Sequence, residues 1–461
     1  DPLSAMVICI LDEAPDGYIK ERSAGVICHI SSLGRPVLGK PARDFVDYLA
    51  SAGMKIWQVL PLNPAGTGNS PYSSSAAFAG EPAFINYDEL PDESGFEAFK
   101  KDNAYWLEGY AAYTVLKEIH GDTAWYEWPE EHRNADPHKA YGRLVSLYAD
   151  KVHELEMQQY RFCAQWNELR AYANSRGVKL MGDLPIYMAA DSADVWANRD
   201  IYLLDDDGRQ RMHAGVPPDG FSADGQDWGN PLYDWERLRE RGFDWWIRRI
   251  LQCAERFDIL RLDHFRAMSE YFAIPEGGRP ADGHWQHGPG LEFFGAIRSA
   301  LDADGYHMEI LAEDLGHLDD GVLSLLRLTG LCGMDVWQFS ASEMEEMPAE
   351  KAERRAFYAG THDNDTLVGF LSKQYPYQDS RMISLQALTD IEKIYRSPAV
   401  LAMLQLQDMF LLGDEARMNV PGIAEGNWKW HMPADSVQNS WPDAPERAAW
   451  FRALAERTGR L

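Results

Sequence analysis

The sequence is poor in cysteine, with five in 461 residues: Cys9, Cys28, Cys163, Cys253 and Cys332. The number is odd and no pair has the CxxC spacing. This pattern argues against a disulfide-stabilised fold, a cysteine-based zinc site and a thioredoxin-like redox site. Scattered cysteines are typical of a protein in a reducing compartment, and we therefore predict a cytoplasmic location.

Long apolar runs and net positive charge are also lacking. The longest apolar run near the start, at 6–11, is too short to span a bilayer or to form the core of a signal peptide. Asp and Glu outnumber Lys and Arg by 72 to 44, which gives a formal net charge of −28. Because such a surface repels nucleic-acid phosphates and anionic lipids, we expect neither nucleic acid nor membrane as a partner.

The sequence does contain enough apolar residues for a large core, since 45% of it is hydrophobic and 25% charged. Short β-branched and aliphatic runs alternate with stretches of helical spacing. Eight runs are predicted to be strands: 25–30, 56–61, 179–187, 259–265, 307–313, 331–339, 356–361 and 417–420. Six amphipathic stretches are predicted to be helices: 42–52, 105–120, 140–176, 235–256, 292–304 and 398–411.

Eight strands alternating with helices are typical of a closed parallel sheet, the (β/α)₈ TIM barrel of the α/β class. We predict one barrel domain over residues 1–461, with no separate C-terminal β-sandwich domain. Its main insertions are a helical subdomain at about 88–176 and a loop of turns at 205–235, expected at the substrate site. The alternative is an open doubly wound sheet, which needs a glycine-rich phosphate turn that this sequence lacks.

Carboxylates gather at the ends of the late predicted strands, where barrel enzymes carry catalytic groups. In the segment ILRLDHF, Arg261 and Asp263 share one face because side chains alternate along a strand. Glu313 ends the next predicted strand, and Asp363, preceded by His362, follows a later one. A guanidinium beside Asp263 would keep that carboxyl group ionised.

Two carboxyl groups at neighbouring strand ends suit the cleavage of a glycosidic bond. One attacks or stabilises the anomeric carbon, and the other protonates the departing oxygen. Because Arg261 would keep Asp263 ionised, we predict Asp263 as the nucleophile and Glu313 as the acid/base. The alternative, a structural ion pair at each position, is less favoured for three carboxylates together. No metal-binding motif, P-loop or GxSxG motif is present, so we expect no metal.

Eight blocks stand in order between about residues 25 and 430: GVICHISSL, WQVLPLNPAGTGNSPYSSSAAFAGEPAFIN, GDLPIYMAADSADVWANRD, GVPPDGFSADGQDWGNPLYDW, RLDHFRA, AEDLG, GTHDNDT and ARMNVPGIAEGNWKW. Together they resemble the 4-α-glucanotransferases (amylomaltases or disproportionating enzymes), relatives of the α-amylases. The resemblance implies a retaining transglycosylase that cleaves α-1,4-glucans or maltooligosaccharides through a covalent glycosyl-enzyme. It would pass the cleaved segment to the 4-OH of another glucan or of glucose, without a metal or an organic cofactor.

The resemblance also implies roles for residues of the matching blocks. Asp263 resembles the family's nucleophile, Glu313 its acid/base and Asp363 its transition-state stabiliser. Ten further residues resemble its saccharide-binding residues: Ser70, Tyr72, Asp183, Gln226, Trp228, Arg261, His264, Asp314, His362 and Asn419.

Three positions depart from the family's pattern. The loop after Leu33 is shorter, Gly220 stands where tyrosine is usual, and His431 stands where arginine is expected. Loops that exclude water decide between transfer and hydrolysis. Two alternatives therefore stay open: a retaining α-glucan hydrolase with the same carboxylates, and a non-catalytic glucan-binding protein. The second has no need for an acid, a nucleophile and a stabiliser together.

Overall fold

The computed structural model describes residues 19–218, 224–316, 318–423 and 425–461. Eight parallel strands form one sheet in the order β10-β11-β12-β1-β2-β3-β6-β9. They are β1 (Ser23–Ile27), β2 (Ile56–Gln58), β3 (Lys179–Leu184), β6 (Ile259–Leu262), β9 (Glu309–Ala312), β10 (Gly333–Val336), β11 (Arg355–Tyr358) and β12 (Leu401–Gln405). A parallel bridge pairs Leu311 with Cys332, and Ala312 N donates to Cys332 O at 2.7 Å, so the two edges of the sheet meet. The predicted (β/α)₈ barrel is confirmed.

The barrel interior is a packed apolar core. Ile27, Ile56, Met181 and Met403 come from four strands and belong to one buried cluster. The residues that alternate with them pack outward, into the larger core beneath the helices. Space inside is tight, because a Cβ on Gly25 would lie only 2.7 Å from Ile56 Cβ. Glycine at this position therefore lets β1 approach β2.

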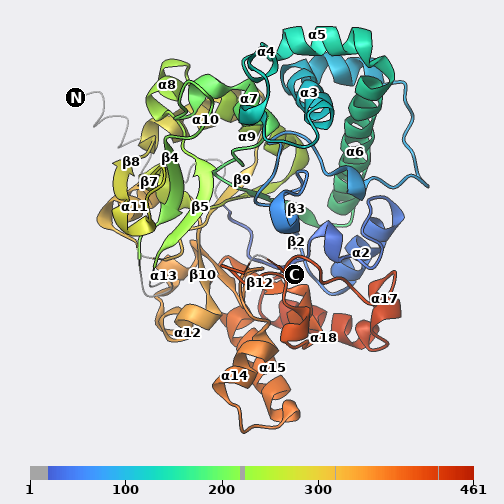
Figure 1. Cartoon of the computed structure of the whole chain (residues 1–461). Coiled ribbons are helices and arrows are strands. Elements are labelled where there is room, and N and C mark those ends of the chain that lie inside the picture. The colour runs from blue at the N-terminus through green and yellow to red at the C-terminus, as the bar shows by residue number, and fades with distance from the viewer. Residues whose placement is uncertain (1–18, 219–223, 317, 424) are drawn as a thin grey trace.

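Helices surround the barrel (Figure 1). They are α2 (Lys40–Ser51), α9 (Asp244–Arg256), α10 (Gly290–Ala303), α11 (Asp320–Thr329), α12 (Trp337–Glu346), α13 (Ala349–Ala352), α14 (Leu367–Gln374), α15 (Ser380–Arg396), α16 (Leu406–Met409), α17 (Val437–Ser440) and α18 (Ala444–Arg457). In the described part of the chain, no helix has the length and apolar character needed to cross a membrane. Within those same residues the cysteines Cys28, Cys163, Cys253 and Cys332 are free thiols.

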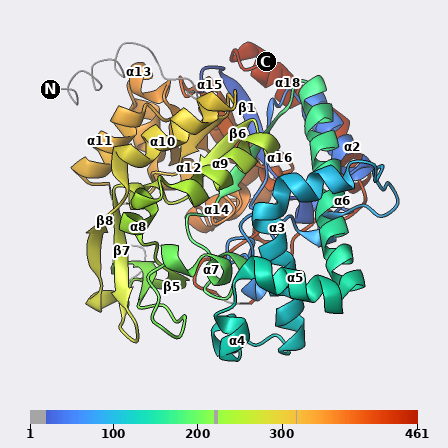
Figure 2. The same ribbon diagram turned by 90° about the horizontal axis from the view of Figure 1, so that it is seen from above.

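Two further groups of elements lie outside the barrel, on different sides of it (Figures 1 and 2). The first contains the helices between β2 and β3: α3 (Phe96–Ile119), α4 (Glu130–Arg133), α5 (Pro137–Leu147) and α6 (Ala149–Ser175). The single helix predicted at 140–176 is thus two helices, α5 and α6. Between β3 and β6 the chain also forms α7 (Ala193–Ala197) and α8 (Trp235–Glu240).

The second group is a four-stranded antiparallel sheet in the order β5-β4-β7-β8. Its strands are β4 (Met212–Val216), β5 (Gln226–Pro231), β7 (Glu270–Pro275) and β8 (His284–His287). The prediction that 205–235 contains only turns and loop is therefore wrong. The segment is rich in Gly, Asp and Pro, which are typical of turns. Pairing with β7, which is distant in sequence, nevertheless holds β4 in a sheet.

The last barrel strand is also a correction. The sequence predicted a helix at 398–411 and a strand at 417–420, whereas β12 lies inside the first segment and 417–420 is irregular. All five residues of β12, LAMLQ, are buried. A strand buried on both faces is a continuous apolar run, which periodicity does not distinguish from a buried helix. Leu, Ala, Met and Gln are moreover good helix formers.

The chain end closes the barrel at the start of its strands. Arg460 is fully buried and its guanidinium donates to five backbone oxygens at 2.8 to 3.3 Å: those of Ser23, Tyr395, Ser397, Ala399 and Val400. Buried carbonyl groups without partners are costly, and Arg460 satisfies those between α15 and β12 together with Arg22, which donates to three of the same oxygens.

We predict that Arg460→Met lowers the free energy of unfolding by about 2 kcal/mol, because five buried carbonyls each lose one hydrogen bond, while Arg22 or Ser23 N still donates to four of them. Urea denaturation of the full chain measures the loss. The control is Arg452→Met, which removes an exposed arginine that donates one bond to Ala50 O at 3.2 Å. We expect that control to change stability by less than about 1 kcal/mol. Equal effects of the two variants would contradict the role given to Arg460.

Candidate active site

Three barrel strands end beside the predicted catalytic carboxylates. Asp263 directly follows β6, Glu313 directly follows β9, and Asp363 lies five residues after β11. Backbone bonds hold the first two exits together. Asp263 N donates to Leu184 O of β3 at 3.1 Å, and Glu313 N donates to Leu262 O of β6 at 3.0 Å. The carboxylates therefore lie at the C-terminal face of the barrel, where barrel enzymes carry their active sites.

A buried arginine joins two of the acidic residues. Arg261 Nη1 donates to both oxygens of Asp183 at 2.7 and 2.9 Å, and to Asp263 Oδ1 at 2.9 Å. The side chains of Arg261 and Asp183 are 5% and 0% exposed, whereas that of Asp263 is 26% exposed. The contact expected between Arg261 and Asp263 is thus present, and Asp183 is a second partner. Burial raises the pKa of Asp183, and the charge of Arg261 opposes that rise.

Glu313 has a perturbed acidity. Its Oε1 accepts a hydrogen bond from Leu315 N and its Oε2 from His264 N, each at 2.8 Å. Burial raises the pKa of Glu313 to about 7; the Asp263 charge adds to the rise, while Arg261 and the two N–H groups oppose it. A carboxyl group with this pKa can give and take a proton near neutrality.

Asp363 belongs to a cluster with Tyr72, His362 and Asn419. Tyr72 donates its hydroxyl to Asp183 Oδ2 at 2.7 Å, and its ring stacks on that of His362 with centroids 4.9 Å apart. His362 Nε2 lies 3.3 Å from Asp363 Oδ1, and Asn419 Nδ2 donates to that same oxygen at 2.6 Å. The predicted residues are therefore linked from Asp263 through Asp183 and Tyr72 to Asp363.

His264 connects the antiparallel sheet with the catalytic carboxylates. Its ring meets that of Trp228 of β5 edge to face, with centroids 4.9 Å apart. Trp228 Nε1 in turn donates to Gln226 Oε1 at 3.1 Å. Burial lowers the pKa of His264 to about 4, so its imidazole is neutral at neutral pH. Gln226 and Trp228 are thus joined to the residue that follows Asp263.

A large groove adjoins the cluster. Its volume is about 1010 Å³, and its lining includes Ser70, Asp227, Trp228, Asn419 and Trp428. Pockets for drug-sized ligands are typically ~300–1,000 Å³, so this groove has room for a ligand of several rings. Of the predicted binding residues, Ser70, Trp228 and Asn419 therefore face the groove.

Asp314 lies apart from the cluster. Its side chain is fully buried and ion-paired with Arg355, and its Oδ1 accepts a hydrogen bond from Met334 N at 2.8 Å. Glu313 and Asp314 both follow β9, and their side chains bind different partners. In this structure Asp314 therefore serves the sheet, and its contact with a ligand stays a prediction.

The departures from the family's pattern are only partly visible. Gly220 lies outside the described residues. After Leu33 the chain reaches α2 within seven residues, consistent with a short loop. His431 is exposed, and its Nδ1 lies 2.8 Å from Met432 O.

Sequence reasoning missed two residues of the cluster. Trp428 packs beside Tyr72 and His362, with ring centroids 5.9 and 5.7 Å apart. Arg417 donates to the backbone oxygen of Asp363 at 2.6 Å and pairs with Asp365. Both residues stand in the block ARMNVPGIAEGNWKW, which was the available signal. Among the residues that the structure describes, no group of three His, Cys, Asp or Glu is arranged to hold a metal ion.

Comparison with known proteins finds 4-alpha-glucanotransferases by sequence and an amylomaltase by structure. A family model described as 4-alpha-glucanotransferase matches residues 28–94 and 88–436. The 4-alpha-glucanotransferase of Thermus thermophilus is 36% identical over 507 aligned residues, covering 95% of this chain and 99% of that protein. That of Streptococcus pneumoniae is 35% identical over 482 residues, with 91% and 95% covered. Amylomaltase from Streptococcus agalactiae, solved in complex with acarbose, superposes with a TM-score of 0.84 at 30% identity, covering 95% of this chain and all of that one.

We predict that Asp263→Asn lowers the pKa of Glu313 below about 7, because the like charge that raises it is removed. NMR titration of protein labelled with ¹³C at the glutamate carboxyl carbon measures the change, with Glu313→Gln assigning the signal. Asp302→Asn removes an exposed carboxylate of α10 and should leave the titration unchanged. An unaltered or higher pKa in Asp263→Asn would show that the two groups do not interact.

Proposed function

The chain belongs to the 4-alpha-glucanotransferase family, which confirms the resemblance seen in its sequence, and from this premise we propose how it works. It is an enzyme of glucan transglycosylation. We infer that it cleaves α-1,4-glucans or maltooligosaccharides with retention, through a covalent glycosyl-enzyme on Asp263. One observation carries the proposal: an ion-paired carboxylate at the end of β6 adjoins, at the end of β9, a carboxyl group whose pKa is about 7.

In the first step Asp263 attacks the anomeric carbon while Glu313 protonates the glycosidic oxygen of the leaving glucan. The bond between carbon and leaving oxygen breaks as the ester bond to Asp263 forms. Arg261 binds Asp263 Oδ1 at 2.9 Å, which leaves Oδ2 available for attack. The N–H groups of His264 and Leu315 hold both oxygens of Glu313 in place.

In the second step the 4-OH of an acceptor glucan or of glucose attacks the anomeric carbon. Glu313, now ionised, takes the proton of that hydroxyl, and Asp263 leaves as a carboxylate. Two displacements at one carbon retain its configuration. Asn419 occupies Asp363 Oδ1, so the other oxygen of Asp363 is available to bind ring hydroxyls and stabilise the transition state.

Aromatic side chains support the choice of a sugar chain as substrate. Tyr72, Trp228 and Trp428 contact the residues of the cluster, and the last two also line the groove. Flat aromatic faces pack against the CH faces of sugar rings, while the nearby carboxylates and amides can bind their hydroxyls. Acceptor sugars bound here would displace water and favour transfer over hydrolysis.

The proposal also covers the cellular location and the domain organisation of the protein. We propose a cytoplasmic location because four of its cysteines are free thiols. We also treat residues 1–461 as one catalytic domain in which 88–176 form a helical subdomain.

Incubation with pure maltotriose tests the activity. We expect longer oligosaccharides and glucose without a net rise in reducing ends, since each cut passes its segment to another sugar. Asp263→Asn and Glu313→Gln should reduce transfer by at least about 1,000-fold, whereas Asp302→Asn should retain it. For the wild-type protein, kcat/KM should fall as the pH rises above about 7, because Glu313 loses the proton that it must deliver.

Two results of this assay would overturn the transfer reading. A rise in reducing ends without longer products would identify a hydrolase. Binding of maltotriose without any product, equal in the wild-type protein and in Glu313→Gln, would identify a glucan-binding protein without catalysis.

A covalent intermediate can be trapped in Glu313→Gln with α-maltosyl fluoride, whose leaving group needs no acid. We predict that the protein gains the mass of one maltosyl group, because the base that activates the acceptor is missing. Peptide mass spectrometry should place the group on Asp263. The double variant Asp263→Asn, Glu313→Gln should gain nothing, and an adduct on another residue would refute the assignment.

A further inference from the structure

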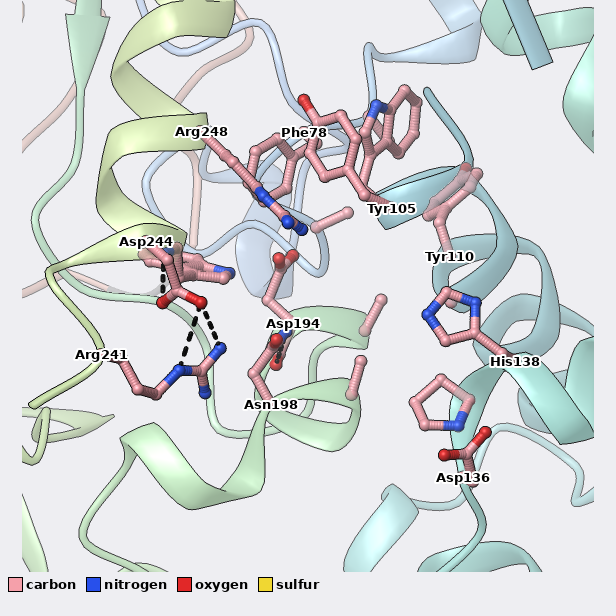
Figure 3. Close-up of a pocket in the computed structure, with 18 residues that line it drawn as sticks. Phe78, Tyr105, Tyr110, Asp136, His138, Asp194, Asn198, Arg241, Asp244 and Arg248 are labelled. Carbon is pink, nitrogen blue, oxygen red and sulfur yellow. Dashed lines mark hydrogen bonds and ion pairs between the residues drawn. The ribbon is translucent and has the colours of Figure 1, made fainter. Parts of the chain in front are cut away.

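A second cavity, of about 230 Å³, lies between α3, α7, α9 and the segment 76–79 (Figure 3). None of its lining residues is among the predicted site residues. Tyr110 lines both this cavity and the large groove, so the two spaces are neighbours separated by α3 side chains. The cavity thus lies beside the groove without being part of the carboxylate cluster.

One wall of this cavity is aromatic. Phe78 meets Tyr105 and Trp245 edge to face, with centroids 5.5 and 5.9 Å apart, and lies nearly parallel to Trp106 at 6.3 Å. Rings at such angles to one another present both faces and edges. A ligand with a flat apolar side can pack against this wall.

The polar groups at the cavity supply both hydrogen-bond donors and an acceptor. Asp194 is 7% exposed, and its Oδ2 accepts a hydrogen bond from Ala77 N. The indole Nε1 of Trp245, which is 4% exposed, makes no hydrogen bond of full geometry, and it lies close enough to Asp194 to oppose the rise in that carboxyl's pKa that burial causes. Arg248 stacks over Tyr105 at 5.0 Å, and Figure 3 shows its guanidinium and the Asp194 carboxylate pointing into the space. A guanidinium and an incompletely satisfied indole N–H beside a carboxylate favour a ligand that can both accept and donate hydrogen bonds.

The charges around the cavity have both signs. Asp194 and Arg248 face it together, and Arg241 at its edge is already paired with Asp244 and Asp200 at 2.9 Å. A strongly charged ligand would gain from one group and be repelled by the other. Neutral hydroxyl groups accept from the indole and guanidinium and donate to the carboxylate, so they suit the whole set.

We propose that this cavity is a second saccharide site that holds a single glucosyl unit. Its volume is below the ~300–1,000 Å³ typical of pockets for drug-sized ligands, so one ring fits where a chain does not. The aromatic wall takes the CH face of the ring, and Asp194, Trp245 and Arg248 bind its hydroxyls. The inference rests on the proposed function only for the choice of glucose as the sugar.

A sugar in this cavity would contact the segment that positions Tyr72. Asp194 holds Ala77 N, and the next backbone bond along α7 runs from Ala193 N to Ser75 O at 2.8 Å. The helix is therefore tied at two points to the loop whose Tyr72 hydroxyl binds Asp183. Ligand bound to Asp194 stabilises this connection between the cavity and the active site.

Isothermal titration with glucose tests the site, since glucose has no glycosidic bond and the wild-type protein cannot turn it over. Gly109→Leu fills the cavity: a Cβ there meets only Ala197 and Pro137 Cβ, at 3.5 and 3.8 Å, and the longer side chain extends into the space. We expect the wild-type isotherm to contain a binding site that is absent in Gly109→Leu and at least tenfold weaker in Arg248→Met. Arg143→Met, an exposed arginine of α5 outside the lining, should match the wild type.

Identical isotherms for all four proteins would overturn the inference. If Gly109→Leu does not fold, the test uses Arg248→Met and a crystal structure of the protein with glucose. Glucose in the groove with none in the cavity would refute the second site. The same four proteins are assayed with maltotriose. If the protein transfers glucosyl units but its glucose binding is unaffected by the cavity variants, only the second site is refuted. If the cavity variants abolish glucose binding but the wild-type protein shows no transfer, only the proposed function is refuted.

Discussion

The active site depends on one buried guanidinium. Arg261 lies in the barrel wall, and strand register places it directly opposite Asp183 on β3. A cation taken out of water must be compensated nearby, and Asp183 and Asp263 both do so. Two carboxylates against one arginine leave the cluster with excess negative charge. Glu313 lies beside this cluster: burial raises its pKa to about 7 and the charge of Asp263 adds to the rise, while Arg261 opposes it.

The barrel turns this charge balance into a fixed geometry. The exits of β3, β6 and β9 are joined by backbone hydrogen bonds, so Asp263 and Glu313 cannot move apart without breaking them. Site residues outside the strand ends lack these backbone bonds, and neighbouring side chains hold them in place instead. Asp363 depends on Asn419, His362 and Arg417, which come from segments without regular structure. The strands thus position the acid and the nucleophile, while loops position the groups that surround a ligand.

The sequence predicted those parts of the fold that local patterns control. Seven barrel strands and the three carboxylates at strand ends could be found because short apolar runs and their polar ends are local features. β12 was missed because a doubly buried strand of Leu, Ala and Met reads as a helix, and β5 because its stability comes from pairing with β4. Trp428 has a positive φ of 63° and meets Tyr72 only through the tertiary fold, so no spacing rule identifies it.

Two buried arginines at opposite ends of the barrel show how stability and chemistry are kept apart. Arg261 is compensated by carboxylates, which titrate and can take part in a reaction. Arg460 is compensated by five backbone oxygens, which do not titrate. Burial and the nearby charge of Arg22 lower the pKa of Arg460 to about 9, so Arg460 keeps its proton and its contacts while Glu313 titrates near 7. The end of the barrel that holds the chain together is insensitive to the proton transfers that the other end requires.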